Sequence, residues 1–247
     1  MIAGPLFFAR YAFPPNERGY CGPADNAALG GYAQAGVTDP GLTQLAKQFE
    51  GAWPYLELIA AANGIADPLD GRVVEAYWVG NSLLENAPVA EYGAFLDERF
   101  RRGGRAWESI PAGAMPHHCF HVFFVYPWYG MLREGRTEPS LQVLDSCRIS
   151  WGRVVTVEPA VVLRRSLTWD GRVLALGSPV PCQVRAGFVT GLRPGDWVSL
   201  HWSRVCDRLS ARQLRALRRY TVRHLRLANA VTSSPQASAS ATPMTSK

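Results

Sequence analysis

The feature that most constrains the fold is a series of short β-branched runs between residues 141 and 202. The runs are RISWGRVVTVE, AVVLRRSLTW, RVLALG, CQVRAGFV and DWVSLHW. Asp170-Gly171 predicts a hairpin turn between two of them, and LRPGD predicts a turn before the last. Five short strands over about 60 residues favour a small closed or nearly closed barrel, because closure removes exposed strand edges.

The residues before this series predict a mainly helical unit. Apolar residues recur at helical spacing between residues 42 and 53, and Asp25 is a suitable N-cap for a helix that stops at Gly36. Two further helices are expected over 70–86 and 88–104. The aromatic and β-branched run CFHVFFVYPWYGML predicts a buried strand, and REGRTEPS predicts a turn-rich connection.

The fold class expected from these patterns is α+β. Residues 1–138 form an α-rich unit that ends in the buried strand, and residues 139–230 form the barrel and a helix that follows it. Ser210 is a suitable N-cap for that helix, ARQLRALRRYTVRHLRLAN. Residues 231–247, rich in Ser, Ala and Thr, predict a disordered tail because they cannot bury enough apolar surface.

Composition narrows the class of protein. Hydrophobic residues make up 47% and charged residues 19%, a globular balance, and no apolar run is long enough to span a membrane. The opening MIAGPLFFARYAFPP lacks the basic start of a signal peptide, so we expect a cytoplasmic protein. The five cysteines are widely spaced with no CxxC pair, which argues against a disulfide framework and against a zinc ribbon.

Two segments of the second half carry a resemblance to a known family. One is CRISWG, where Cys147 precedes Gly152, and the other is GDWVSLH, which ends in His201. With the expected barrel between them and a helix after them, residues 143–227 resemble the HypC/HupF family, the assembly chaperones of nickel–iron hydrogenases. Trp151 stands where that family has a proline.

The resemblance implies a barrel like that of oligonucleotide-binding domains. It also implies that Cys147 and His201, with Trp151 and Gly152 beside the thiol, bind a partner or iron. The implied cargo is iron with cyanide and carbonyl ligands, for which a thiolate is a suitable carrier. The implied partner is a hydrogenase-assembly scaffold protein or the precursor of the hydrogenase large subunit. Such a chaperone is not itself an enzyme.

A second group of metal-ligating residues lies in PHHCFH. On a strand, His117, Cys119 and His121 would share one face and His118 would point away. Three nitrogen and sulfur donors on one face favour zinc or iron, or a thiol nucleophile with a histidine base. The alternative function is therefore a metal-dependent or thiol enzyme at this cluster, with zinc as the alternative metal.

Two other features are candidates for binding or reactivity. Cys21, in RGYCGPADN, precedes an expected helix, and a thiol at a helix N-terminus has a lowered pKa. A basic face is expected from arginines at helical spacing, which are Arg208, Arg212, Arg215, Arg219, Arg223 and Arg226. This face is either solvated or docks an acidic partner. The lack of a stacking platform argues against nucleic acid.

Overall fold

The computed structural model describes residues 2–87 and 110–232 of the chain. The expected helix over 88–104 and the expected tail from residue 233 onward lie outside the described residues. The helical elements before the sheet are α1 (Gly4–Asn16), α2 (Asn26–Ala35), α3 (Pro40–Lys47), α4 (Trp53–Ala62), α5 (Gly71–Trp78), a 3-10 turn (Ser82–Asn86), α7 (His118–Phe120), a π-helical turn (His121–Val125), α8 (Trp128–Arg133) and α9 (Thr137–Cys147).

Short polar side chains begin several of these helices, as local sequence signals predict. The carboxylate of Asp25 accepts a hydrogen bond from the backbone N–H of Ala28, which caps α2. Ser210 and Gln213 bond each other's backbone N–H groups at the start of α10 (Ala211–Thr232). Both predicted N-caps are confirmed, because capping satisfies backbone donors that have no partner inside the helix.

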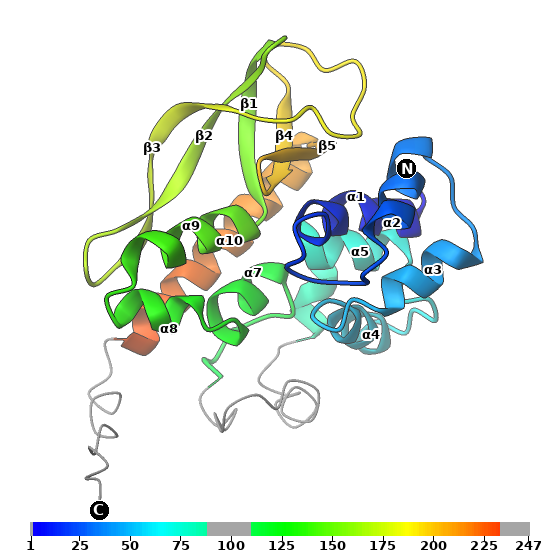
Figure 1. The fold of residues 1–247 in the computed structure, drawn as a ribbon. Coiled ribbons are helices and arrows are strands. Elements are labelled where there is room, and N and C mark those ends of the chain that lie inside the picture. Colours follow the sequence, from blue (N-terminus) through cyan, green and yellow to red (C-terminus); the bar gives the residue numbers. More distant parts are fainter. Residues whose placement is uncertain (1, 88–109, 233–247) are drawn as a thin grey trace, which may run out of the picture.

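The second half of the chain forms a five-stranded antiparallel sheet followed by a helix (Figure 1). Its strands are β1 (Ser150–Val157), β2 (Ala160–Trp169), β3 (Leu174–Gln183), β4 (Trp197–His201) and β5 (Arg204–Arg208). Their order is β3-β2-β1-β4-β5. The sheet is open, and one parallel bridge between Arg185, just after β3, and Arg204 in β5 joins its two ends.

The described residues form five strands, as the sequence predicts. Two of the predicted strands overlap a single strand, β3, and the fifth strand was not predicted. RVLALG and CQVRAGFV do not form separate strands, because β3 runs through Gly177, Pro179 and Pro181 without a break. β3 is an edge strand, where a residue that donates no hydrogen bond is tolerated. The fifth strand is RVCDR, which follows β4 after a tight turn at Trp202 and Ser203, both with positive φ.

The expected buried strand at residues 119–126 is wrong. These residues form the single turn of α7 and the π-helical turn, which begin at a hydrogen bond from the Cys119 N–H to the His117 ring. A continuous apolar run fits a helix buried on all sides as well as it fits a strand. The expected turn-rich connection is a turn only at residues 134–136, between α8 and α9. Cys147 is the last residue of α9 and does not open a strand.

The helical part and the sheet share buried apolar clusters. Tyr77 and Trp78 of α5 belong to the same buried cluster as Ile149 and Trp151 beside and within β1. The Tyr11 hydroxyl of α1 lies 2.7 Å from the Ser199 hydroxyl of β4, both buried. α10 packs against α7, β1 and β3 and passes below the sheet in Figure 1. Two of the three buried clusters of described residues contain residues from both sides of the predicted boundary near residue 138.

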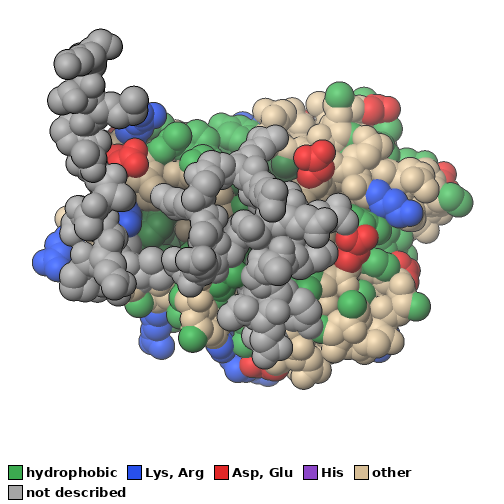
Figure 2. Space-filling model, turned by 90° about the horizontal axis from the view of Figure 1, so that it is seen from below, with side chains coloured by type: hydrophobic (Ala, Val, Ile, Leu, Met, Phe, Trp, Pro, Cys, Tyr) green, Lys and Arg blue, Asp and Glu red, His purple; other side chains and the backbone are tan. Residues whose placement is uncertain are grey.

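All five histidines of the chain are buried. The face drawn in Figure 2 accordingly displays no histidine side chain on the surface formed by described residues. Every helix within residues 2–87 and 110–232 is too short or too polar to cross a bilayer.

Candidate metal site

Three side chains that can ligate a metal meet beneath the sheet. They are His118 at the start of α7, Cys147 at the end of α9 and His201 at the end of β4. Each offers one ligand atom, and these atoms all lie within 4.8 Å of one another. All three residues are buried, with at most 5% of their surface exposed. The cluster could hold a metal ion.

A small cavity adjoins the cluster. Its volume is about 20 Å³, and its lining includes His118, Cys147, His201, Cys21 and His121. A site of this size has room for a single water or ion, which needs about 10–15 Å³. Aromatic rings surround it, since Phe49, Tyr77, Trp78 and Tyr126 also line the cavity.

The orientation of His201 is set by the first helix. Its Nδ1 lies 2.7 Å from the backbone oxygen of Tyr11. A carbonyl oxygen only accepts, so Nδ1 carries the proton and Nε2 carries the lone pair. Nε2 has no hydrogen-bond partner among the described residues. Burial lowers the pKa of His201 to about 4, so the ring is neutral near pH 7. This is how metal-ligating histidines are held.

His118 is held at both ring nitrogens. Nδ1 lies 3.1 Å from the Tyr77 hydroxyl, and Nε2 lies 2.9 Å from the backbone oxygen of Cys147. Nε2 therefore donates to that carbonyl, and Nδ1 accepts from the tyrosine. Burial, followed by the nearby His201 and His121, lowers the pKa of His118 well below its usual value. To bind a metal, His118 has to exchange one of these two partners for the ion.

Cys147 is a neutral thiol in this environment. Burial, with a smaller contribution from the charge of Cys21, raises the pKa of its thiol well above the usual value. A bound divalent cation reverses this preference, because a coordinating thiol loses its proton outright. The thiol is thus unreactive without an ion and becomes an anionic ligand when an ion is present.

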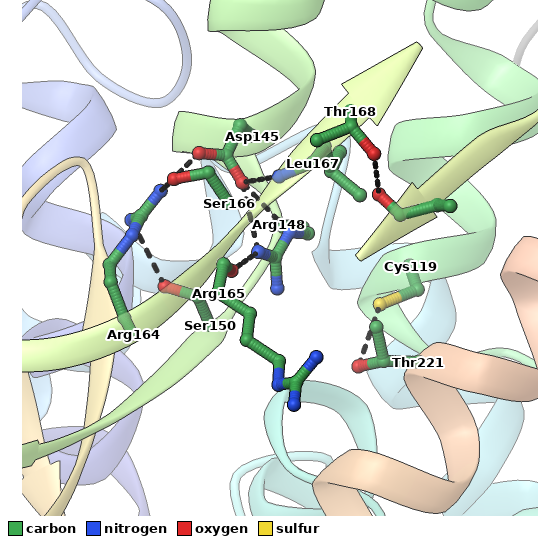
Figure 3. A network of polar contacts seen from close by, with 11 residues as sticks. Cys119, Asp145, Arg148, Ser150, Arg164, Arg165, Ser166, Leu167, Thr168 and Thr221 are labelled. Carbon is green, nitrogen blue, oxygen red and sulfur yellow. Dashed lines mark hydrogen bonds and ion pairs between the residues drawn. The ribbon is translucent and has the colours of Figure 1, made fainter. Parts of the chain in front are cut away.

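A buried ionic network fixes the end of α9 where Cys147 lies (Figure 3). The Asp145 carboxylate accepts hydrogen bonds from Arg148 at 2.8 Å, from Arg164 and from the backbone N–H of Leu167 at 2.9 Å. Arg148 also donates to the backbone oxygen of Arg165 at 2.6 Å. These bonds tie the last turn of α9 to β2, so they determine where Cys147 lies relative to the sheet.

The other two residues taken from the resemblance are structural. Gly152 in β1 faces β2 closely, and a Cβ there would lie 2.9 Å from the Val162 side chain. Trp151 is buried, and the guanidinium groups of Arg148 and Arg218 lie 6.0 and 5.8 Å from the centre of its ring. Neither is among the residues that line the cavity.

The trio His117, Cys119 and His121 does not share a face, because the segment is helical. The His117 ring accepts from the N–H of Cys119 and stacks on His224, with centroids 5.6 Å apart. Burial raises the pKa of Cys119 to about 11, and its sulfur contacts the Thr221 hydroxyl at 3.7 Å. Of the three, His121 alone lines the cavity, and burial lowers its pKa to about 3.

Cys21 is not an activated thiol at a helix N-terminus. Asp25 caps α2, and burial raises the pKa of Cys21 to about 12, so the expected lowered pKa is wrong. The sequence predicts Cys21 at a loop-to-helix junction, and the fold places it in the lining of the same cavity as Cys147 and His201.

Several arginines of the predicted basic face form ion pairs or hydrogen bonds within the chain. Arg212 pairs with Glu75 at 2.8 Å, and Arg219 pairs with Glu85 at 2.7 Å. Arg208 lies in β5 rather than on the helix and pairs with Asp196, while Arg223 donates to the backbone oxygen of Gly113. Arg215 and Arg226 are exposed. The face therefore largely fastens α10 to neighbouring segments.

The residue that sequence reasoning missed is His118. Strand alternation assigns it to the face opposite His117 and His121, so it was excluded from the metal cluster. In a helical turn that geometry does not hold, and His118 points to Cys147 and His201. No local pattern in PHHCFH singles out His118, because its contact with Cys147 and His201 depends on the tertiary fold.

No curated protein and no solved structure matches the chain. One family model does match, and it spans residues 1–235, from the first helix to beyond the last residues that the structure describes. Because the match covers the helical part, the sheet and α10 together, these parts recur as one unit. The chain belongs to the family described as "Family of unknown function (DUF6390)".

Proposed function

We propose that this protein binds a metal in the cavity beside His118, Cys147 and His201 and serves as an accessory protein in the maturation of nickel–iron hydrogenases. One observation carries the proposal. Cys147 and His201, the two residues on which the HypC/HupF resemblance depends, have ligand atoms within 4.8 Å of each other and of a third donor. A resemblance that rested on chance spacing would give no reason for these two side chains to meet.

The connectivity of the sheet supports the same proposal. β1 pairs with both β2 and β4, β4 pairs with β5, and residues after β3 bridge to β5 in parallel. A five-stranded, partly open Greek-key sheet of this kind is the architecture of oligonucleotide-binding barrels. We therefore propose an OB-like barrel as the scaffold of the site.

The donors fit a borderline or soft transition metal. Two neutral imidazoles and one thiol suit zinc, iron, nickel or copper, and they do not suit magnesium or calcium, which prefer oxygen. The cavity of about 20 Å³ fits an ion without further ligands. An iron cargo that carries cyanide and carbonyl ligands fits only if the covering loop, residues 17–25, moves outward.

The proposed partner is a hydrogenase-assembly scaffold protein or the precursor of the large subunit, and the proposed location is the cytoplasm, where hydrogenase precursors are assembled. In this role the protein holds and transfers a metal and does not turn over a substrate. Cys147 would bind the cargo, His201 would complete its coordination, and the helical part would shield both.

Metal analysis of the purified protein tests the first step. Wild type loaded with zinc or iron(II) should retain about one ion per chain after gel filtration, and Cys147→Ser and His201→Asn should retain little. Cys182→Ser is the matched control, because this half-buried cysteine of β3 is not part of the cavity lining. Equal retention by wild type and Cys147→Ser contradicts metal binding at this site.

Affinity capture tests the second step. Tagged wild type should recover hydrogenase-assembly proteins from the cells that produce it, and Cys147→Ala should recover clearly less. Equal recovery by the two proteins removes the thiol from partner binding. If wild type recovers none of these proteins, the assembly role is contradicted. The metal site is then tested by the first experiment alone.

A further inference from the structure

We propose that Cys21 supplies a fourth ligand, so that the bound metal is held by two imidazoles and two thiolates. The inference rests on the proposed metal binding at His118, Cys147 and His201. Cys21 belongs to the helical part of the chain. Cys147 and His201 belong to residues 143–227, which resemble the HypC/HupF family.

The first argument is position. Cys21 lies in the loop between α1 and α2 and lines the same cavity as the three clustered donors. The side-chain amide of Asn16, itself only 2% exposed, donates to the backbone oxygens of Cys21 and Pro23, both at 2.8 Å. Gly22 has a φ of +85°, and a Cβ there would lie 2.3 Å from the Phe49 ring. The loop is thus packed closely against the cavity wall at Cys21.

The second argument is that the loop is fastened to the turn beside His201. Tyr20 packs on Trp202 with ring centroids 4.2 Å apart, and the Arg18 guanidinium lies 5.5 Å from the same ring. Glu17 pairs with Arg204 at 2.9 Å. Trp202 directly follows His201, so contacts on the outer side of the loop keep Cys21 and His201 in a fixed relation.

The third argument is charge. A divalent ion with one thiolate leaves a net positive charge in a buried, largely apolar site, which is costly. None of the described residues that line the cavity carries a carboxylate, so only thiols and phenols can supply a second negative charge. A thiol is a stronger acid than a phenol, and thiolates are the common anionic ligands of zinc. Cys21 is therefore the group that best neutralises the ion.

Coordination number points to the same residue. Two histidines and one cysteine leave one position of a tetrahedron open, and closed structural zinc sites use four protein ligands. His121 also lines the cavity, but it adds no charge, and its ring packs edge-on against Tyr126 at 4.5 Å and beside Gly51. A Cys2His2 set closes the site with zero net charge.

Cobalt(II) substitution tests the inference, because thiolate-to-cobalt charge-transfer absorption scales with the number of thiolates. Wild type should show this band together with the intense visible bands of tetrahedral cobalt. Cys21→Ser should still bind cobalt, with about half of the charge-transfer intensity. Its affinity should fall by about tenfold or more, since even outer-shell partners contribute that much. Cys182→Ser should match wild type.

The outcomes separate the two proposals. Full charge-transfer intensity and unchanged affinity in Cys21→Ser overturn the fourth ligand, while the three-residue site stands. Failure of wild type to bind cobalt overturns both. Should Cys21→Ser fail to fold, X-ray absorption at the zinc edge of zinc-loaded wild type decides, and the first coordination shell should contain two sulfur atoms and two nitrogen atoms. A first shell with one sulfur atom overturns the inference.

Discussion

Lowering the pH from 7.5 to 5.5 should remove much of the stability of the metal-free protein, because its histidines are buried without charge. Burial lowers the pKa of His201 and His224 to about 4 and that of His121 to about 3. Burial also lowers the pKa of His117 and His118 well below the usual value. In the unfolded chain each of these side chains titrates near pH 6.5.

The direction of the effect follows from proton binding. The unfolded state takes up protons as the pH falls through about 6.5, whereas His201, His224 and His121 in the folded state take up almost none until about pH 4. The stabilisation is therefore present above pH 6.5 and is lost as the pH falls toward the folded-state pKa values. Between pH 7.5 and 5.5 each of these three histidines costs about 1.4 kcal/mol, so the three cost about 4 kcal/mol, and His117 and His118 change the stability in the same direction. Typical domains have only about 5–15 kcal/mol in total.

Urea unfolding at pH 7.5, 6.5 and 5.5, with a chelator present throughout, measures this loss. A His224→Phe variant is the internal check: it should be less stable at pH 7.5, yet its loss on acidification should be smaller by about 1.4 kcal/mol. In the unfolded chain carboxylates titrate near pH 4, which lies below this window. A loss below about 2 kcal/mol in wild type would refute the buried, neutral state of these histidines.

Four substitutions test other parts of the structure by urea unfolding. Asp145→Asn leaves two buried arginines without a counter-charge and should cost about 3–5 kcal/mol, whereas Arg219→Ala, at an exposed ion pair, should cost at most about 1 kcal/mol; similar costs would contradict the assigned burial. Tyr11→Phe should cost about 1–2 kcal/mol through its lost bond to β4, with metal affinity unchanged because the backbone oxygen remains. Gly22→Ala should cost about 1–3 kcal/mol, and an unchanged midpoint would show that the loop is not packed as described.

The parts of the fold that the sequence predicted correctly are those determined by local signals. β2 was expected at AVVLRRSLTW, the residues it occupies, and the predicted turn at Asp170-Gly171 directly follows it. The N-caps Asp25 and Ser210 were found because a cap needs only its own helix. The mixed helix and sheet architecture with a C-terminal helix followed from such signals.

The parts that were missed depend on burial and on distant neighbours. The run at residues 119–126 is apolar on every side, so its periodicity could not separate a strand from a buried helical turn. Arg148 is a fully buried charge, and its environment exists only because Asp145 and the backbone of β2 meet around it. Local sequence patterns carry no signal for a buried ion pair of this kind.

The candidate site was predicted in part. Cys147 and His201 were singled out from the resemblance, while nothing in the spacing of PHHCFH assigned His118 to them. Cys21 was noted for its position before a helix, and its place beside the cavity depends on packing against Phe49 and Trp202. The sequence provides a list of candidate metal ligands. It does not show which of them lie together, because that depends on the tertiary fold.

The hydrogen bond between His201 and the Tyr11 backbone joins residues 190 positions apart in the chain. Closing so long a loop is among the slow steps of folding, because the chain loses entropy on closure before the contact can stabilise the fold. The three candidate ligands therefore come together only at a late stage of folding. Under the proposed function, an ion would be bound only after folding is complete, and refolding should proceed at the same rate in the presence of a chelator.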